Sequence, residues 1–122
     1  MLEAIARRGT AGDAQWLLAI ARDANQPVET RRRALDLAAR GGMTSTQMLA
    51  LYDGVNDPTL KESLIRLYAQ SGDRAAVEKL ISIARTDSSY TLRRRAISSL
   101  SRTDDPRARQ ALVEITTLTT TR

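Results

Sequence analysis

Apolar residues recur every three or four positions along most of the chain. Val77, Leu80 and Ala84 show this spacing, and Leu60 and Leu64 belong to a second stripe of the same kind. Residues three and four apart lie on one face of an α-helix, so each stripe predicts a helix with one buried face. No segment shows the strict alternation that is typical of a half-buried strand. The pattern therefore predicts an all-α chain.

The predicted helices come in pairs that repeat along the chain. A shift of 32 residues places Leu80-Ile81 on Leu112-Val113, and a shift of 63 places residues 17–22 on residues 80–85. Upstream the best shift is 30 residues. The unit is therefore about 30 to 33 residues long and recurs about three and a half times, which gives about seven helices.

Capping residues mark the ends of the predicted helices. Residues that accept hydrogen bonds from free backbone N–H groups stand before the first helix of each pair: Thr10, Thr44 or Ser45, Asp73 and Asp105. Pro106 occupies a first-turn position, where its missing N–H breaks no helical hydrogen bond. The second helix of each pair should stop at glycine: Gly9, Gly41-Gly42 and Gly72.

A helix pair of this size cannot bury its apolar face alone, whereas stacked pairs can. A closed helical bundle would also be all-α, but a bundle does not require a fixed period with the same caps in every unit. The regular period favours a solenoid of stacked pairs.

Residues 72–115 resemble HEAT-like repeats of the short kind that is named after phycobilisome lyase subunits and is common in bacterial proteins. The resemblance rests on Gly72-Asp73, Leu80-Ile81, Asp87, Leu92-Arg93, Ala96-Ile97, Leu100, Asp105-Pro106 and Ala111-Leu112. It implies a right-handed α-α superhelix of the armadillo type, in which second helices line the concave side and first helices the convex side. We expect residues 1–122 to form a single array of such repeats. We also expect this array to be a fragment of a longer protein, or its end helices to pair with a neighbouring molecule.

Composition excludes several kinds of chemistry. Cys and His are both absent, which excludes disulfides, zinc sites of the Cys/His type, thiol catalysis and a histidine general base. No phosphate-binding loop, dinucleotide-binding glycine run or nucleophile elbow is present. The sequence therefore predicts no catalytic, cofactor-binding or metal-binding residue, and a protein that is not an enzyme. No apolar run reaches the roughly 18 residues of a membrane span.

The net charge of +5 raises the question of a polyanionic partner. Helical phase places three cross-repeat columns on the outward face of the second helices: Arg32–Glu62–Arg94, Asp36–Arg66–Ser98 and Arg40–Gln70–Arg102. The first two columns contain a carboxylate, whereas a groove that follows phosphates should be uniformly positive. A solvated face is the favoured interpretation, and the basic third column is a candidate contact for an acidic partner.

Three further cations point toward the apolar stripe at the first turn of each second helix. They are Arg31, Lys61 and Arg93. Their long stems should lie along the edge of the core while the heads reach an oxygen, which loop residues Asn25, Asp57 and Asp87 are placed to supply. HEAT-like families resemble this arrangement, with a loop Asp paired to a helix Arg along the stack. We therefore interpret the row as a structural ladder, rather than as an anion-binding site.

The few aromatic residues are mostly interpreted as core. Trp16 shares a stripe with Leu17 and aligns with Met48 and Leu80 at successive shifts of 32 residues, so packing is favoured over a role in ligand stacking. Tyr90 lies in a predicted loop and should be exposed.

The resulting functional hypothesis is a non-catalytic module that binds another protein, or another region of the parent chain. Nucleic-acid binding through a basic concave face is the alternative. Chromophore attachment, as in bilin lyases, is disfavoured because the resemblance is to the repeat only.

Overall fold

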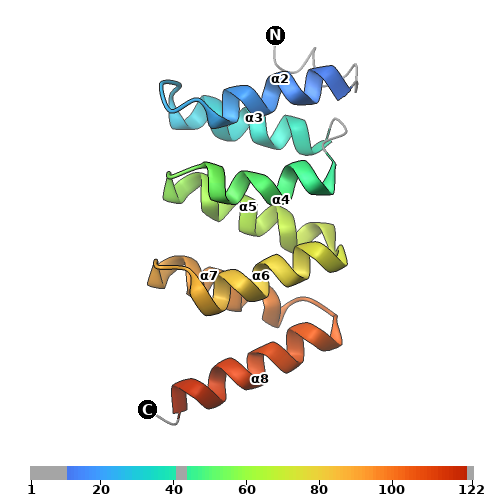
Figure 1. Cartoon of the computed structure of the whole chain (residues 1–122), viewed down its shortest axis with the longest axis vertical. Coiled ribbons are helices and arrows are strands. Elements are labelled where there is room, and N and C mark those ends of the chain that lie inside the picture. The colour runs from blue at the N-terminus through green and yellow to red at the C-terminus, as the bar shows by residue number, and fades with distance from the viewer. Residues whose placement is uncertain (1–10, 41–43, 121–122) are drawn as a thin grey trace. The chain divides into compact units, whose positions relative to one another are not determined.

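The computed structural model describes residues 11–40 and 44–120. Within these ranges every regular element is an α-helix (Figure 1). The helices are α2 (Ala11–Arg22), α3 (Val28–Arg40), α4 (Ser45–Gly54), α5 (Pro58–Ser71), α6 (Arg74–Thr86), α7 (Tyr90–Ser101) and α8 (Pro106–Thr120). The prediction of an all-α chain is confirmed.

The chain divides into two compact units, and the division falls inside α5. The first unit ends at Leu64 and the second begins at Ile65. The first therefore holds α2, α3, α4 and the start of α5, and the second holds the rest of α5 with α6, α7 and α8.

Capping fixes the helix boundaries much as the sequence predicts. Thr44 caps α4 through a capping box, in which its Oγ1 accepts from the Gln47 N–H at 3.1 Å and the Gln47 side chain accepts from the Thr44 N–H at 3.0 Å. Asp73 is the N-cap residue of α6 in extended conformation, but its side chain accepts no capping hydrogen bond, so the prediction of a side-chain cap is wrong there. Helix α8 begins at Pro106, as predicted. The predicted cap Thr10 and the predicted stops Gly9 and Gly41-Gly42 lie outside the described residues.

In the first unit, α2 and α3 pack against each other as an antiparallel pair (Figure 1). Helix α2 contributes Leu17, Leu18 and Ala21 to the core, and all three are buried. Helix α3 contributes Ala34, Leu35, Leu37 and Ala38. Alanine at these positions lets the helix backbones approach closely, which suits a chain without phenylalanine.

The prediction that Trp16 packs in the core is wrong, because its side chain is 43% exposed. The prediction failed because it used the wrong alignment of the repeats. The shift of 63 residues, not that of 32, matches burial in α2 and α6: Leu17 and Leu80 are both buried, as are Ala21 and Ala84. In that register Trp16 aligns with the half-buried Lys79, at the edge of the stripe.

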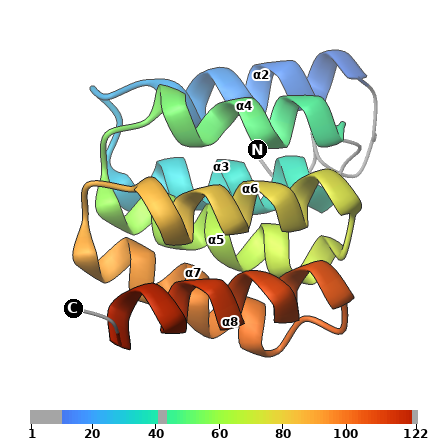
Figure 2. The same cartoon turned by 60° about the horizontal axis from the view of Figure 1, so that its bottom comes forward.

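In the second unit, α6 packs against α7, and α8 contacts both. Helices α6 and α8 run in the same direction and α7 runs in the opposite one, as Figures 1 and 2 both show. The core is formed by apolar side chains of all three helices: Ala76, Val77, Leu80, Ile83 and Ala84 of α6, Leu92, Ala96 and Leu100 of α7, and Ala108 and Ala111 of α8. Each of these sets follows the helical spacing from which the helices were predicted.

Gly72 ends α5 in the left-handed conformation, with φ of 64°. A Cβ added there would meet nothing within 4 Å, so only the backbone conformation opposes a side chain. Gly54 is the last residue of α4. A Cβ added there would also meet nothing within 4 Å, and its φ is not positive.

These two glycines should respond to alanine in opposite directions. Gly72→Ala should lower the free energy of unfolding by about 1–2 kcal/mol, since an L-residue is strained at positive φ. Gly54→Ala should raise it by about 0.4–1 kcal/mol, because the unfolded chain loses freedom and no strain is added. Urea titrations followed by circular dichroism measure both values. Destabilisation of equal size in both variants would contradict the helix stop at Gly72.

Candidate interaction surface

The nine residues of the three predicted columns all lie at least partly in solvent. They are Arg32, Asp36 and Arg40 on α3, Glu62, Arg66 and Gln70 on α5, and Arg94, Ser98 and Arg102 on α7. None is buried. Each column joins residues of both units, so the columns themselves stay a prediction.

On α3 the outward charges are partly neutralised within the helix. Arg32 Nη2 lies 2.6 Å from Glu29 Oε2, one turn before it. The same face holds an open depression of about 300 Å³ that is lined by Glu29, Thr30, Arg32, Arg33 and Asp36. Its lining is polar and mixed in sign, unlike the enclosed apolar pocket of a typical small-molecule site.

On α7 the outward face is basic. Residues 90–101 contain three arginines and no carboxylate. Tyr90 is 65% exposed, and the Cζ atoms of Arg93 and Arg94 each lie 5.7 Å from the centroid of its ring. Both guanidinium groups are therefore within cation–π range of one aromatic ring. The prediction that Tyr90 is exposed is confirmed, although Tyr90 begins α7 rather than lying in the loop.

At the C-terminal end of α7, the C-cap residue Arg102 bonds back to Ser98. Its Nη2 donates to Ser98 Oγ at 3.1 Å, and its Nε donates to the Ser98 carbonyl at 3.4 Å. Both side chains are exposed. This bond holds Arg102 against the helix and leaves its remaining N–H donors toward solvent.

The inward cation Arg31 is buried, with only 6% of its surface exposed. Its Nε donates to the Ala21 carbonyl at 2.9 Å. Ala21 lies in the last turn of α2, where carbonyls have no partner within the helix. The acceptor is therefore a main-chain oxygen rather than the predicted side chain of Asn25, because the last carbonyls of α2 have no helical partner and Arg31 reaches one of them.

The two counterparts of Arg31 also reach the end of the preceding helix. Arg93 Nη1 donates to the carbonyl of Asp87, the C-cap of α6, at 2.6 Å. Lys61 Nζ lies 4.9 Å from the centroid of the Tyr52 ring in the last turn of α4. In each case a cation sits near the negative end of a helix dipole.

The loop aspartates accept hydrogen bonds from main-chain N–H groups near the starts of the following helices. Asp57 Oδ1 accepts from the Thr59 and Leu60 N–H groups at 2.8 and 3.3 Å, which caps α5. Asp87 Oδ1 accepts from the Ser89 N–H at 2.8 Å. The expected pairing of Asp57 with Lys61 is not what the structure shows, because the free N–H groups at the start of α5 take the carboxylate.

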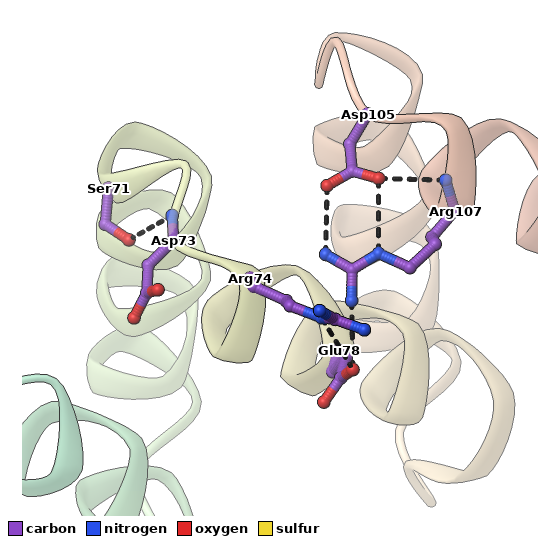
Figure 3. A network of polar contacts seen from close by, with 6 residues as sticks. All are labelled: Ser71, Asp73, Arg74, Glu78, Asp105 and Arg107. Atoms are coloured by element: carbon purple, nitrogen blue, oxygen red, sulfur yellow. Dashed lines mark hydrogen bonds and ion pairs between the residues drawn. The ribbon is translucent and has the colours of Figure 1, made fainter.

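A polar network that the sequence analysis missed joins α6 to α8 (Figure 3). Arg107 donates to both oxygens of Asp105, with Nη2 3.1 Å from Oδ2 and Nε 3.4 Å from Oδ1. Its Nη1 donates to Glu78 Oε1 at 2.9 Å. Glu78 also lies 3.9 Å from Arg74 Nε. One guanidinium thus links the start of α8 to the first turns of α6.

Arg107 also sets the protonation of Asp105. Its side-chain hydrogen bonds, and then the bond from its main-chain N–H, hold the pKa of Asp105 below its ordinary value. The carboxylate in turn raises the pKa of Arg107 above its ordinary value. Both groups are therefore charged at neutral pH.

A second link of opposite polarity lies seven residues farther along both helices, where Arg85 of α6 pairs with Glu114 of α8. In both links the partners are 29 residues apart. The signal was present in the sequence as complementary charges at that separation. It differs from the apolar period of 32 residues, because a surface pair joins positions offset by about one turn between neighbouring helices.

Nothing in residues 11–40 and 44–120 gathers three or more carboxylates closely enough to hold a metal ion. No helix in these ranges is long and apolar enough to cross a membrane. The described geometry is thus one of charged, solvated helix faces.

Comparison with known proteins identifies one family. The family described as HEAT repeats matches residues 45–121. No curated protein and no solved structure matches the chain. The match spans more than half of the sequence and covers α4 to α8.

Removal of the buried Arg31 side chain should destabilise the first unit. Arg31→Ala leaves the Ala21 carbonyl without its side-chain donor and removes the packed stem, so the free energy of unfolding should fall by about 2–3 kcal/mol. Arg33→Ala, an exposed change on the same helix, should alter it by about 0.5 kcal/mol or less. Urea titration of both variants measures the difference. Equal effects would show that Arg31 does not stabilise the end of α2.

The charge of Asp105 should stabilise the fold at neutral pH but not in acid. Because its native pKa is lowered, its contribution is present above the ordinary carboxylate pKa and is lost as the pH falls through the native one. Asp105→Asn keeps a side-chain acceptor for the Arg107 N–H and removes the charge.

Urea midpoints of wild type and Asp105→Asn should therefore differ at about pH 7, and the difference should shrink as the pH falls below the ordinary carboxylate pKa and through the lower native one. Asp104→Asn is the control, since the Asp104 side chain is fully exposed and lies 3.7 Å from Arg109. Its midpoint should follow that of wild type throughout. A gap between wild type and Asp105→Asn that persists unchanged in acid would contradict the role of the Asp105 charge.

Proposed function

Since the chain belongs to the HEAT-repeat family, we propose that it is a non-catalytic module that binds another protein, or another region of its parent chain. Proteins of this family generally serve as scaffolds for protein interactions. We further assign its repeats to the short, phycobilisome-lyase type, because the unit of about 30 to 33 residues is compact. The observation that carries the proposal is the family match over residues 45–121.

The surface chemistry supports a binding role over a catalytic one. Cys and His are absent from the sequence, and the depression on α3 is open and polar. A general base, a nucleophile and an enclosed site are the usual parts of a catalytic centre. Exposed helix faces rich in arginine are instead typical of protein interfaces, where this residue is enriched.

We propose that, within each unit, the outward residues of the second helices contact the partner: those of α3 and the start of α5 in the first unit, and those of the rest of α5 and α7 in the second. All nine residues of the three predicted columns are exposed or half-exposed. The first helices α6 and α8 bear charges that satisfy one another, such as Arg85 with Glu114 and Arg107 with Glu78. A charged side chain that is already in an ion pair gains less free energy from a new ion pair with a partner.

Nucleic-acid binding is the alternative, and one observation favours it. Residues 65–122 contain 11 Lys and Arg against 6 Asp and Glu, a difference of +5, whereas residues 1–64 contain 8 of each. The whole net charge therefore lies in the second unit. Against nucleic-acid binding, several of those cations lie within 4 Å of a carboxylate, among them Arg74, Arg85, Arg107 and Arg109.

Site-directed photocrosslinking in the parent organism tests the proposed function. A photoreactive amino acid at Ser98 of α7 should give a reproducible adduct with a protein. Ser82 of α6 is the matched control, because it is an exposed serine on the first helix of the same pair. Ser82 should give little or no adduct with that protein.

Nuclease treatment before gel analysis distinguishes the two functions. A Ser98 adduct that nuclease removes would contradict protein binding and support the alternative. Absence of any adduct from Ser98, with the tagged chain expressed and folded, would also contradict the proposal.

A further inference from the structure

The exposed face of α7 differs from those of the other second helices. Helix α3 contains Glu29 and Asp36, and α5 contains Glu62, whereas α7 has no carboxylate. Its outward residues Tyr90, Arg94 and Ser98 and its C-cap residue Arg102 are all exposed, and we call these four residues the α7 ridge. Among the described residues, neither Arg94 nor Arg102 forms an ion pair.

Both arginines of the α7 ridge are held in place without being neutralised. The Tyr90 ring lies 5.7 Å from Arg94 Cζ, and Ser98 accepts two hydrogen bonds from Arg102. An arginine that is already ordered loses less conformational entropy when it binds an anion. The ridge therefore presents two ordered guanidinium forks, and these match the planar, bidentate geometry of carboxylates.

The spacing of the forks defines a short binding segment. Arg94 and Arg102 are eight residues apart on one helix, or about 12 Å along its axis. Four residues of an extended peptide span about 13 Å, so acidic side chains at positions i and i+4 would meet the two arginines. Asp104, which lies within 4 Å of Arg109, follows Arg102 closely in the chain and limits the ridge at that end.

These observations favour an acidic peptide over a nucleic acid. Single-stranded nucleic acids are usually held by bases stacked on free aromatic rings. Tyr90 is the one exposed aromatic residue among the described residues of the second unit, and its ring already carries the guanidinium groups of Arg93 and Arg94. A ridge of two forks is also smaller than the set of about 6–10 phosphate contacts in a typical DNA interface.

We propose that the α7 ridge is the docking site for an acidic segment of a partner protein, whose Asp or Glu side chains pair with Arg94 and Arg102 while Tyr90 positions Arg94. This rests on the proposed function and names the chemistry of the partner.

Fluorescence anisotropy with a labelled ten-residue peptide of alternating Asp and Glu tests the site at low salt. Wild-type protein should bind this peptide and should not bind its Asn/Gln analogue. Arg94→Gln with Arg102→Gln should weaken binding about tenfold or more. The control is Arg74→Gln with Arg109→Gln, which removes the same charge from exposed positions of the same unit and should weaken it about twofold or less.

A second pair of variants tests the positioning role of Tyr90. Tyr90→Leu removes the ring without a change in charge and should weaken binding about threefold, whereas Tyr90→Phe keeps the ring face and should bind as wild type does. Circular dichroism melts establish that each variant is folded. Should the double variant not fold, the single variants Arg94→Gln and Arg102→Gln should each weaken binding more than Arg74→Gln does.

Three results would overturn the proposal. They are no binding of the acidic peptide by wild type, equal losses in the two double variants, and tighter binding of a labelled single-stranded DNA ten-mer that depends on the same two arginines. The first two leave the proposed function intact, since the Ser98 photocrosslink would still report a protein partner through other contacts. The third, together with a nuclease-sensitive crosslink, would show that the proposed function has failed as well.

Discussion

The structure depends on the need of each helix to bury its apolar stripe against another helix. A single helix of 10 to 15 residues, the range of lengths in this chain, is marginal in water. The core that pairs the helices contains no phenylalanine and is built largely from leucine and alanine. Small side chains at the contacts, such as Ala96 and Ala108, let the helices approach closely, and this close packing supplies most of the stability.

Helix ends are the second constraint, because each leaves backbone groups without a helical partner. In successive repeats, the same types of residue bond to these backbone groups. Aspartate or threonine stands at the starts, as Asp57 and Thr44 do. A cation from the next helix reaches the end of the preceding one, as Arg31 and Arg93 do. These side chains complete the hydrogen bonding of helix ends, which supports their interpretation as structural.

The other charged side chains of the second unit differ in whether they form ion pairs, and this difference underlies the proposed binding site on α7. Helices α6 and α8 pair their charges across the helix interface, as Glu78 does with Arg107. Such exposed pairs contribute little stability individually, but they fix how neighbouring helices are aligned. Helix α7 contains no carboxylate, so its arginines cannot form ion pairs within the helix. Under the function proposed above, the exposed face of α7 is therefore the part of the described structure best suited to recognise a partner.

The sequence by itself determined the helices, their pairing in repeats and most of their core, because apolar spacing and caps are local signals. Thr44, Gly72 and Asp105 were recognisable as helix boundaries for the same reason. It also indicated that Arg94, Ser98 and Arg102 share an outward face. Only the tertiary structure decided which groups the charged side chains meet. Arg31 binds a carbonyl of another helix, Arg107 joins α6 to α8, and Trp16 falls outside the buried stripe. These outcomes depend on the offset between neighbouring helices, and helical periodicity alone does not specify that offset.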